Sequence, residues 1–229
     1  MSGLPESLFL NPVWHALHGP HRHLARSEGG ACRYPADVAP FAAIDAPSAA
    51  AFAELYLLLD PDESVWIVDY GCRAPGLAVV DALECVQMVL PEEVEMPVPG
   101  CDVLPLNAAH AQEMVALTNV AFPGFFRSAT YRMGSFFGVR VGGELVAMGG
   151  ERLLLPGRPE MSAICTHPDH RGEGYASDVI RHLARHHRRA GLVSWLHVAA
   201  PNRRGIDLYT SLGFERVRSL MLHRITRSS

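Results

Sequence analysis

The stretch His167-Pro-Asp-His-Arg-Gly-Glu-Gly-Tyr-Ala176 lies between a strand-like segment and a helix-like one. Glu160-Met-Ser-Ala-Ile-Cys-Thr166 precedes it, and after it apolar side chains recur at helical spacing as far as Gly191, a residue type that often ends a helix. Gly172 and Gly174 let a ligand approach the backbone closely, where the N–H groups of a helix start are free. The stretch therefore suits a phosphate or pyrophosphate, although an ordinary glycine-containing turn is the simpler alternative.

The second half of the chain alternates between helical and extended patterns. Gly142-Gly143 predicts a tight hairpin turn between two apolar strands, and Pro156-Gly-Arg-Pro159 predicts the turn to a third strand. The predicted helices are 107–120, 176–190 and 202–212, and the predicted strands are 136–141, 144–154, 160–166, 193–198 and 214–225, the last as one or two strands. This order predicts an α+β fold in which helices flank a mixed, mostly antiparallel sheet.

A dinucleotide-binding fingerprint is the main alternative for the glycine-containing stretch. It requires Gly-x-Gly-x-x-Gly, and Ser177 stands where the third glycine belongs. The acidic residue expected about 20 residues later is missing, because 192–198 contains neither Asp nor Glu. The strands before the stretch are also predicted to be antiparallel. We therefore exclude this class of fold.

The 229 residues include 20 basic ones, and all of them are arginine. Without lysine there can be no lysine Schiff base, no pyridoxal-phosphate attachment and no Walker-type phosphate loop. A protein kinase is excluded for the same reason. With 48% hydrophobic residues, the chain has enough apolar material for a real core.

Charge divides the chain into two parts. Residues 1–100 have a net charge of −10, and residues 101–229 have a net charge of +6. Between them the proline-rich, acidic stretch 91–100 indicates a linker. We therefore predict a smaller, acidic α/β domain of uncertain role over 1–98 and a second domain over 102–229. The basic second domain predicts affinity for an anionic ligand.

The first half contains fewer functional signals. We expect a helix over 36–59 and strands over 64–70 and 83–90. The segment around Gly19-Pro20 carries four histidines, His15, His18, His21 and His23. Because no acidic or cysteine residue is near them, a mobile polar loop is favoured over a metal site.

The start of the chain lacks the basic and apolar regions of a signal peptide. The most apolar stretch, 49–59, contains Glu54 and is too short to span a membrane. Five cysteines, odd in number and without paired spacing, indicate reduced thiols. We therefore expect a cytoplasmic protein that does not bind a membrane and holds no metal.

Three segments of the second half match one superfamily in their order and predicted structure. Arg171-Gly-Glu-Gly-Tyr-Ala176 matches a Gln/Arg-x-x-Gly-x-Gly/Ala loop, and the strand before it ends in His167-Pro-Asp169. Asn202…Leu208-Tyr209…Leu212-Gly-Phe214 matches a second block. With these segments, residues 102–226 resemble the Gcn5-related N-acetyltransferase (GNAT) superfamily. The similarity is to its FR47-like branch, which resembles the carboxy-terminal domain of glycine N-acyltransferases.

The resemblance implies transfer of an acyl group, usually acetyl, from acetyl-CoA to the amine of a small molecule or peptide. Coenzyme A would be a co-substrate, with its pyrophosphate on 171–177 and its pantetheine arm along 164–166. The third strand must then diverge from 193–198 to expose its edge. The cofactor-binding residues that the resemblance implies are Ile164, Cys165, Thr166, Arg171, Gly172, Glu173, Gly174, Tyr175, Ala176, Ser177, Asn202 and Tyr209.

The resemblance also implies catalytic roles. Tyr209 matches the superfamily's acid, which protonates the departing thiolate, and a phenol with a pKa of about 10 is protonated at neutral pH. A core aromatic packed beside Leu208 is the alternative. For the base, Glu160 stands where some members carry a catalytic glutamate, while Glu151 and ordered waters are alternatives. Cys165 is interpreted as a small apolar strand residue.

Two other functions compete with the enzyme. A non-catalytic acyl-CoA sensor is disfavoured by the presence of Tyr209. A nucleic-acid-binding protein is disfavoured because the arginines of 181–189 have no interleaved aromatics, so we expect no nucleic-acid partner. The acidic first domain suggests a cationic acceptor. The sequence leaves the oligomeric state open, a homodimer included.

Overall fold

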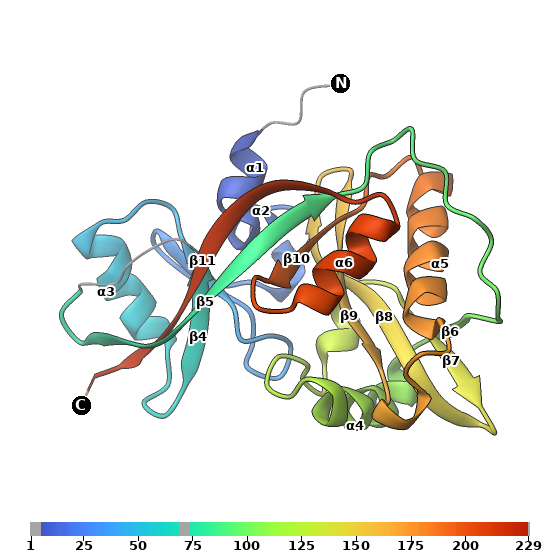
Figure 1. The fold of residues 1–229 in the computed structure, drawn as a ribbon. Helices are drawn as coiled ribbons and strands as arrows, with labels where there is room; N and C mark the ends of the chain where they lie inside the picture. The colour runs from blue at the N-terminus through green and yellow to red at the C-terminus, as the bar shows by residue number, and fades with distance from the viewer. Residues whose placement is uncertain (1–5, 69–73, 229) are drawn as a thin grey trace.

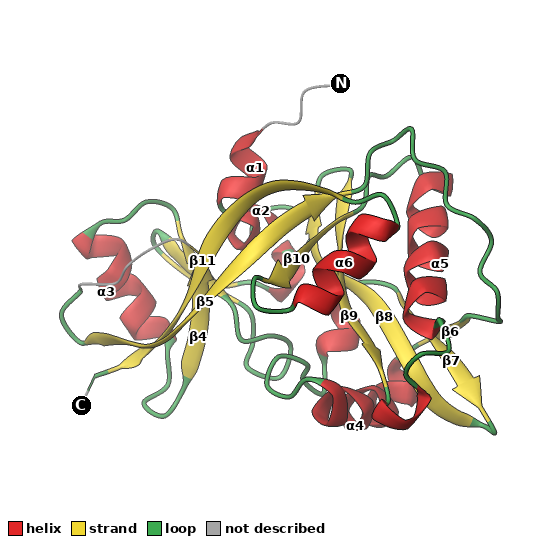
Figure 2. Cartoon of the chain, viewed as in Figure 1, coloured by secondary structure: helices red, strands yellow, loops and turns green. Residues whose placement is uncertain are grey.

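The computed structural model describes residues 6–68 and 74–228, and one large sheet forms its centre (Figures 1 and 2). From edge to edge the sheet contains β4 (Ser64–Val68), β11 (Glu215–Arg227), β5 (Leu77–Val89), β10 (Trp195–Ala199), β9 (Arg158–Thr166), β8 (Glu144–Leu155), β7 (Phe136–Val141) and β6 (Leu104–Leu106). All neighbours are antiparallel except β9 and β10, which are parallel. The predicted α+β fold with a mixed, mostly antiparallel sheet is confirmed.

Helices cover both faces of this sheet. They are α1 (Glu6–Leu10), α2 (Pro12–Leu17), α3 (Ala49–Leu58), α4 (Ala111–Ala121), α5 (Tyr175–Arg189) and α6 (Arg203–Ser211). Trp195 is buried with side chains of α1 and α2, whereas the next residue, Leu196, is buried with side chains of α5 and α6. Consecutive strand residues point to opposite faces, so the two helix pairs lie on opposite sides of β10.

All the elements predicted for the second half are present, with shifted ends. The helix predicted over 107–120 begins as a 3-10 turn, Ala108–His110, and continues as α4. The closing segment is one strand, β11, whose pairing with β5 shifts register between Arg216 and Arg218. The short edge strand β6 was not predicted.

The helix predicted over 36–59 is wrong in its first part. Only α3 is helical, and its N-cap is Ser48, whose hydroxyl accepts a hydrogen bond from the N–H of Ala51 at 3.1 Å. Before it, β3 (Ala42–Ile44) pairs with β2 (Ala31–Arg33), which pairs with β1 (Arg26–Glu28) in a separate three-stranded sheet. Alanine-rich sequence has no strand preference, so this pairing is decided by burial.

The mobile loop predicted for the histidines is also wrong. His15 lies in α2, and His21 is only 1% exposed. The ring nitrogens of His21 lie 2.7 Å from the hydroxyl of Tyr34 and 2.8 Å from the carbonyl oxygen of Met133. Burial lowers the pKa of His21 to about 4, so the ring is neutral at pH 7. Within the described residues, no cluster of His, Cys, Asp and Glu could hold a metal ion.

The first hundred residues contribute two strands to the large sheet. β5 lies between β11 and β10, and β4 forms the edge beside β11. β5 is longer than the predicted 83–90, while residues 69 and 70 of the predicted strand over 64–70 lie outside the described part. The acidic segment and the basic segment therefore share one sheet.

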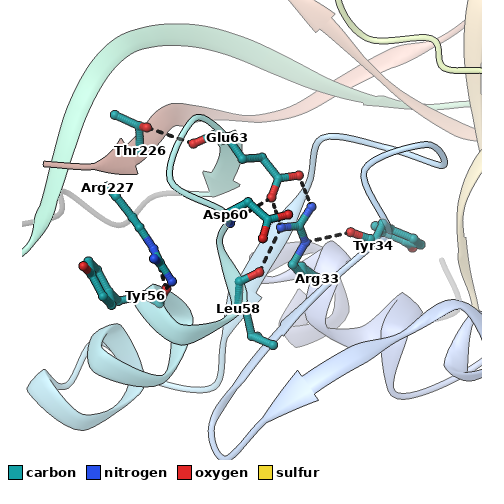
Figure 3. Close-up of polar contacts among 8 residues, drawn as sticks. All are labelled: Arg33, Tyr34, Tyr56, Leu58, Asp60, Glu63, Thr226 and Arg227. Carbon is teal, nitrogen blue, oxygen red and sulfur yellow. Dashed lines mark hydrogen bonds and ion pairs between the residues drawn. The ribbon is translucent and has the colours of Figure 1, made fainter. Parts of the chain in front are cut away.

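Polar contacts attach α3 and β4 to the end of the chain (Figure 3). The Arg227 guanidinium donates to the carbonyl oxygen of Tyr56 at 2.9 Å, and the Thr226 hydroxyl donates to that of Glu63 at 2.8 Å. Arg33, from β2, forms a two-bond ion pair with the Glu63 carboxylate and donates to the carbonyl oxygen of Leu58. The buried guanidinium of Arg33 therefore joins the small sheet to the large one.

Among the helices of the described residues, none is both long enough and apolar enough to cross a membrane. The four cysteines Cys32, Cys85, Cys101 and Cys165 are free thiols, and Cys72 lies outside the described part of the chain.

Candidate active site

β9 and β10 pair only where they begin. Glu160 faces Trp195 and Met161 faces Leu196, and beyond these residues β5 is the one strand among the described residues that pairs with β10. The divergence of the two strands, expected from the sequence, is confirmed. The edge of β9 from Ser162 onward therefore has backbone N–H and C=O groups that another extended chain could bind.

A bulge in β9 lies at the point of divergence. Ala163 has a φ of +56°, a left-handed conformation that is uncommon for a residue with a side chain. The pairing of β9 with β8 shifts register here, between Ser162 and Cys165. As a result Met161 and Ile164, three residues apart, both pack on the α5 face, which a regular strand would not allow. The bulge thus changes which side chains face the gap.

The glycine-containing loop leads directly into α5. Gly174 is the N-cap of α5 and has a φ of +84°, and Gly172 has a φ of +97°. Both are left-handed conformations that favour glycine. Within the part of the chain that the structure describes, an added Cβ would meet no atom within 4 Å at either position. The N-terminus of α5 therefore has open space before it and no side-chain cap over its free N–H groups.

One cavity of about 730 Å³ joins the gap between the strands to this loop. All the residues predicted to bind the cofactor line it, apart from Glu173: Ile164, Cys165, Thr166, Arg171, Gly172, Gly174, Tyr175, Ala176, Ser177, Asn202 and Tyr209. Glu173 lies in the same loop but is exposed to solvent. Residues that are up to 45 positions apart in the sequence thus meet around one space.

Tyr209 lies on α6, at the wall of the cavity. Its ring packs edge-on against Phe214, with the ring centroids 5.7 Å apart. Burial raises the pKa of Tyr209 above its ordinary value, so the phenol keeps its proton at neutral pH. The start of α6 is capped by Asn202, whose side-chain oxygen accepts a hydrogen bond from the N–H of Gly205 at 2.9 Å. The cap and the ring contact together position the phenol.

Comparison with known proteins places this chain in a family. The FR47-like family model matches residues 136–222. A protein of the GNAT family from Novosphingobium aromaticivorans DSM 12444 is 35% identical, with a TM-score of 0.86, and the match covers 96% of this chain and 99% of that one. The chain belongs to the GNAT family. Because that match spans nearly the whole chain, it includes the first hundred residues, which the sequence resemblance left out.

Two more distant GNAT structures share the fold. The GCN5-related N-acetyltransferase from Kribbella flavida is 16% identical, with a TM-score of 0.64, and the match covers 100% of this chain and 97% of that one. A GCN5-related N-acetyltransferase-like protein from Streptococcus suis 89/1591 is 11% identical, with a TM-score of 0.59, and the match covers 99% and 95% of the two chains. No functionally curated protein matches the sequence.

In this GNAT chain Glu160 is fully buried and does not line the cavity. Its carboxylate accepts hydrogen bonds from Nε of Arg152 at 2.9 Å and from Nη2 at 2.5 Å, and lies 2.6 Å from Nδ1 of His197. Burial would raise the pKa of Glu160, but Arg152 and His197 outweigh it and lower the pKa to about 2. Glu160 is therefore ionised, and both of its partners line the cavity.

Glu151, the other glutamate considered as a base, also lies away from the cavity. Its carboxylate accepts a hydrogen bond from the N–H of Ser135 at 2.7 Å and lies 3.0 Å from Nε2 of His187. Nδ1 of His187 is 2.8 Å from the hydroxyl oxygen of Ser194. These buried contacts connect β8 to the last turn of α5, so the role of Glu151 in this arrangement is structural.

Sequence reasoning missed the cavity residues Arg152 and His197. A signal existed for Arg152, because the predicted turn at 156–159 places it across the hairpin from Glu160, and opposite charges on facing strands attract. His197 had no comparable signal. It reaches Glu160 only because β10 pairs with the start of β9, and the register of this pairing cannot be predicted from the local sequence.

Proposed function

We propose that this GNAT protein is an acyl-CoA-dependent N-acyltransferase that transfers acetyl from acetyl-CoA to an amine. The observation that carries the proposal is one cavity that joins three features: the open edge of β9, the uncapped start of α5 and the phenol of Tyr209. The strand edge suits the amides of a pantetheine arm. The helix start suits its phosphates, because free N–H groups and the positive end of the helix dipole attract anions.

The residues present fit coenzyme A. Gly172 and Gly174 leave open space where a side chain would obstruct a pyrophosphate. Arg171, in this loop, and Arg204, on α6, add positive charge to the lining of the cavity. The backbone of 164–166 would bond the pantetheine arm, which supplies the thioester to be broken. Asn202 would act indirectly, by holding the start of α6 in place.

Tyr209 is the proposed acid. The amine nitrogen attacks the thioester carbonyl carbon, the C–S bond breaks, and the phenol proton passes to the departing sulfur. Because burial raises the pKa of Tyr209, the proton is present at every pH at which the enzyme would work. General acid catalysis of this kind typically contributes about 10²–10⁴-fold.

We assign removal of the amine proton to water. Of the three candidates for the base, Glu160 and Glu151 are buried and bonded elsewhere, and neither lines the cavity. Water that enters the cavity can accept this proton without a protein carboxylate. We propose Glu160 as a positioning residue, which holds the side chains of Arg152 and His197 at the cavity wall.

The experiment is a calorimetric titration with acetyl-CoA, followed by a free-thiol assay with a panel of amines. We expect binding of acetyl-CoA and not of NAD or ATP, and at 100 times the dissociation constant the folded state should gain about 2.7 kcal/mol. Equal binding of NAD would contradict the proposal. Tight binding without thiol release for any amine would favour the non-catalytic sensor.

A further inference from the structure

One end of the cavity faces the first half of the chain. This acceptor end is lined by Leu83, Cys85, Phe125, Thr130, Arg152 and Leu222. Cys85 and Leu222 belong to the core on the α1 and α2 side, whereas Leu208 and Tyr209 pack on the α5 and α6 side. A molecule at the acceptor end therefore reaches the gap between β9 and β10 from the side opposite to the glycine-containing loop 171–177.

Arg152 brings a guanidinium group to the acceptor end. Its Nε and Nη2 donate to Glu160, and its Cζ lies 4.9 Å from the centre of the Phe41 ring. The side chain is only 17% exposed, yet Nη1 has no hydrogen-bond acceptor within residues 6–68 and 74–228. A guanidinium carries five N–H donors, so the edge formed by Nη1 and Nη2 can still bind a second carboxylate.

The charge of the cavity differs from the charge of the surface around it. The first hundred residues are strongly acidic and suggested a cationic acceptor. Among the described residues that line the cavity, however, there is no Asp or Glu, while Arg152, Arg171 and Arg204 are present. A cationic acceptor would therefore find no carboxylate partner here, and an anionic group would find the free edge of Arg152.

We infer that Arg152 binds a carboxylate on the acceptor, so the acceptor is an amino acid with an apolar side chain. This inference rests on the proposed function. Leu83, Phe125 and Leu222 form apolar walls around the guanidinium, where an apolar side chain gains from burial. A dicarboxylic acyl group on coenzyme A would present the same carboxylate chemistry, and the experiment separates the two sources.

The first measurement compares L-leucine with L-leucinamide as acceptors of acetyl from acetyl-CoA. The amide keeps the shape of the amino acid but loses its negative charge, and its less basic amine is the more reactive at neutral pH. We expect kcat/KM to be at least about tenfold higher for leucine, as for loss of a charge-assisted hydrogen bond. An equal or lower value for leucine would overturn the inference.

The second measurement repeats this comparison with Arg152→Lys. Lysine keeps a positive charge beside Glu160 but has no second edge for a carboxylate. We expect the leucine-to-leucinamide ratio of kcat/KM to fall at least about tenfold. This ratio of kcat/KM values does not depend on the fraction of the variant that is folded, because both acceptors are assayed with the same enzyme preparation. Arg140→Lys, in an exposed ion pair with Glu113, is the control and should keep the wild-type ratio.

Two further arms identify the source of the carboxylate. A preference for succinyl-CoA over acetyl-CoA that Arg152→Lys abolishes would assign the carboxylate to the acyl group and overturn the inference.

The second of these experiments measures binding and needs no turnover. It compares the affinities of N-acetyl-L-leucine and N-acetyl-L-leucinamide for the enzyme with coenzyme A bound. Tighter binding of the acid, lost in Arg152→Lys, would support the site even if every amine failed as a substrate. Equal binding would overturn it, while thiol release with both acceptors would still support the proposed function.

Discussion

The two ends of the cavity are built in different ways. The end proposed to bind the phosphates, here called the phosphate end, comes from one continuous stretch, 171–177, whose conformation depends on Gly172 and Gly174 and on the helix that follows. The acceptor end is assembled from β5, β8, β11 and the segment after α4, which are far apart in the sequence. The first end is exposed and presents backbone N–H groups, whereas the second contains a buried guanidinium and its carboxylate partner.

The difference predicts that the two ends respond differently to substitution. A backbone site depends little on side-chain identity, so it suits a co-substrate that stays the same. A site made of side chains from separate strands can change with single substitutions and leave the sheet intact. We expect substitutions at the two ends to separate coenzyme A affinity, turnover and stability.

The largest effect is expected from Tyr209→Phe, at the junction of the two ends. The variant keeps the ring and its contact with Phe214 but removes the proton. Loss of general acid catalysis should lower kcat by about 10²–10⁴-fold, with little change in the affinity for coenzyme A. Thiol release with a working acceptor and a calorimetric titration measure the two quantities. A variant within about threefold of wild type in kcat would contradict the assignment of Tyr209 as the acid.

The acceptor end should depend strongly on Glu160 for its stability. Glu160→Ala leaves the Arg152 guanidinium buried without its partner, which typically costs about 3–5 kcal/mol of unfolding free energy. The matched control is Glu113→Ala, which removes an exposed ion pair with Arg140 and should cost no more than about 1 kcal/mol. Urea unfolding of both variants checks the difference. Equal losses would show that the buried pair contributes no more than the exposed one.

The phosphate end should respond to Gly174→Val with a selective loss of binding. The valine side chain would occupy the open space before α5, so coenzyme A should bind at least about tenfold more weakly, the scale of one lost charge-assisted contact. Gly157→Val is the control, since Gly157 also has a positive φ and open space but lies in the turn between β8 and β9. Both variants should lose similar stability. If both also keep full affinity, the phosphates bind elsewhere.

The parts that the sequence predicted correctly share a local cause. The hairpin at Gly142-Gly143, the loop 171–177 and the amphipathic helix after it each depend on residues within one short window. The errors occurred where distant contacts decide. Ala42–Ile44 forms a strand because it pairs with β2 and is buried, and His21 is ordered by Tyr34 and Met133. These contacts cannot be predicted from the residues next to Ala42–Ile44 or next to His21.

The sequence by itself determined the fold class, the family resemblance and the glycine-containing loop before α5, because hydrophobic periodicity and glycine position act locally. Only the tertiary structure decided that Glu160 is buried behind the cavity and that Arg152 and His197 line it. It also decided that the acceptor end contains a free guanidinium edge despite the acidic first half. Net charge sums over a whole surface, whereas the charge in a cavity depends on the few side chains that strand register brings together.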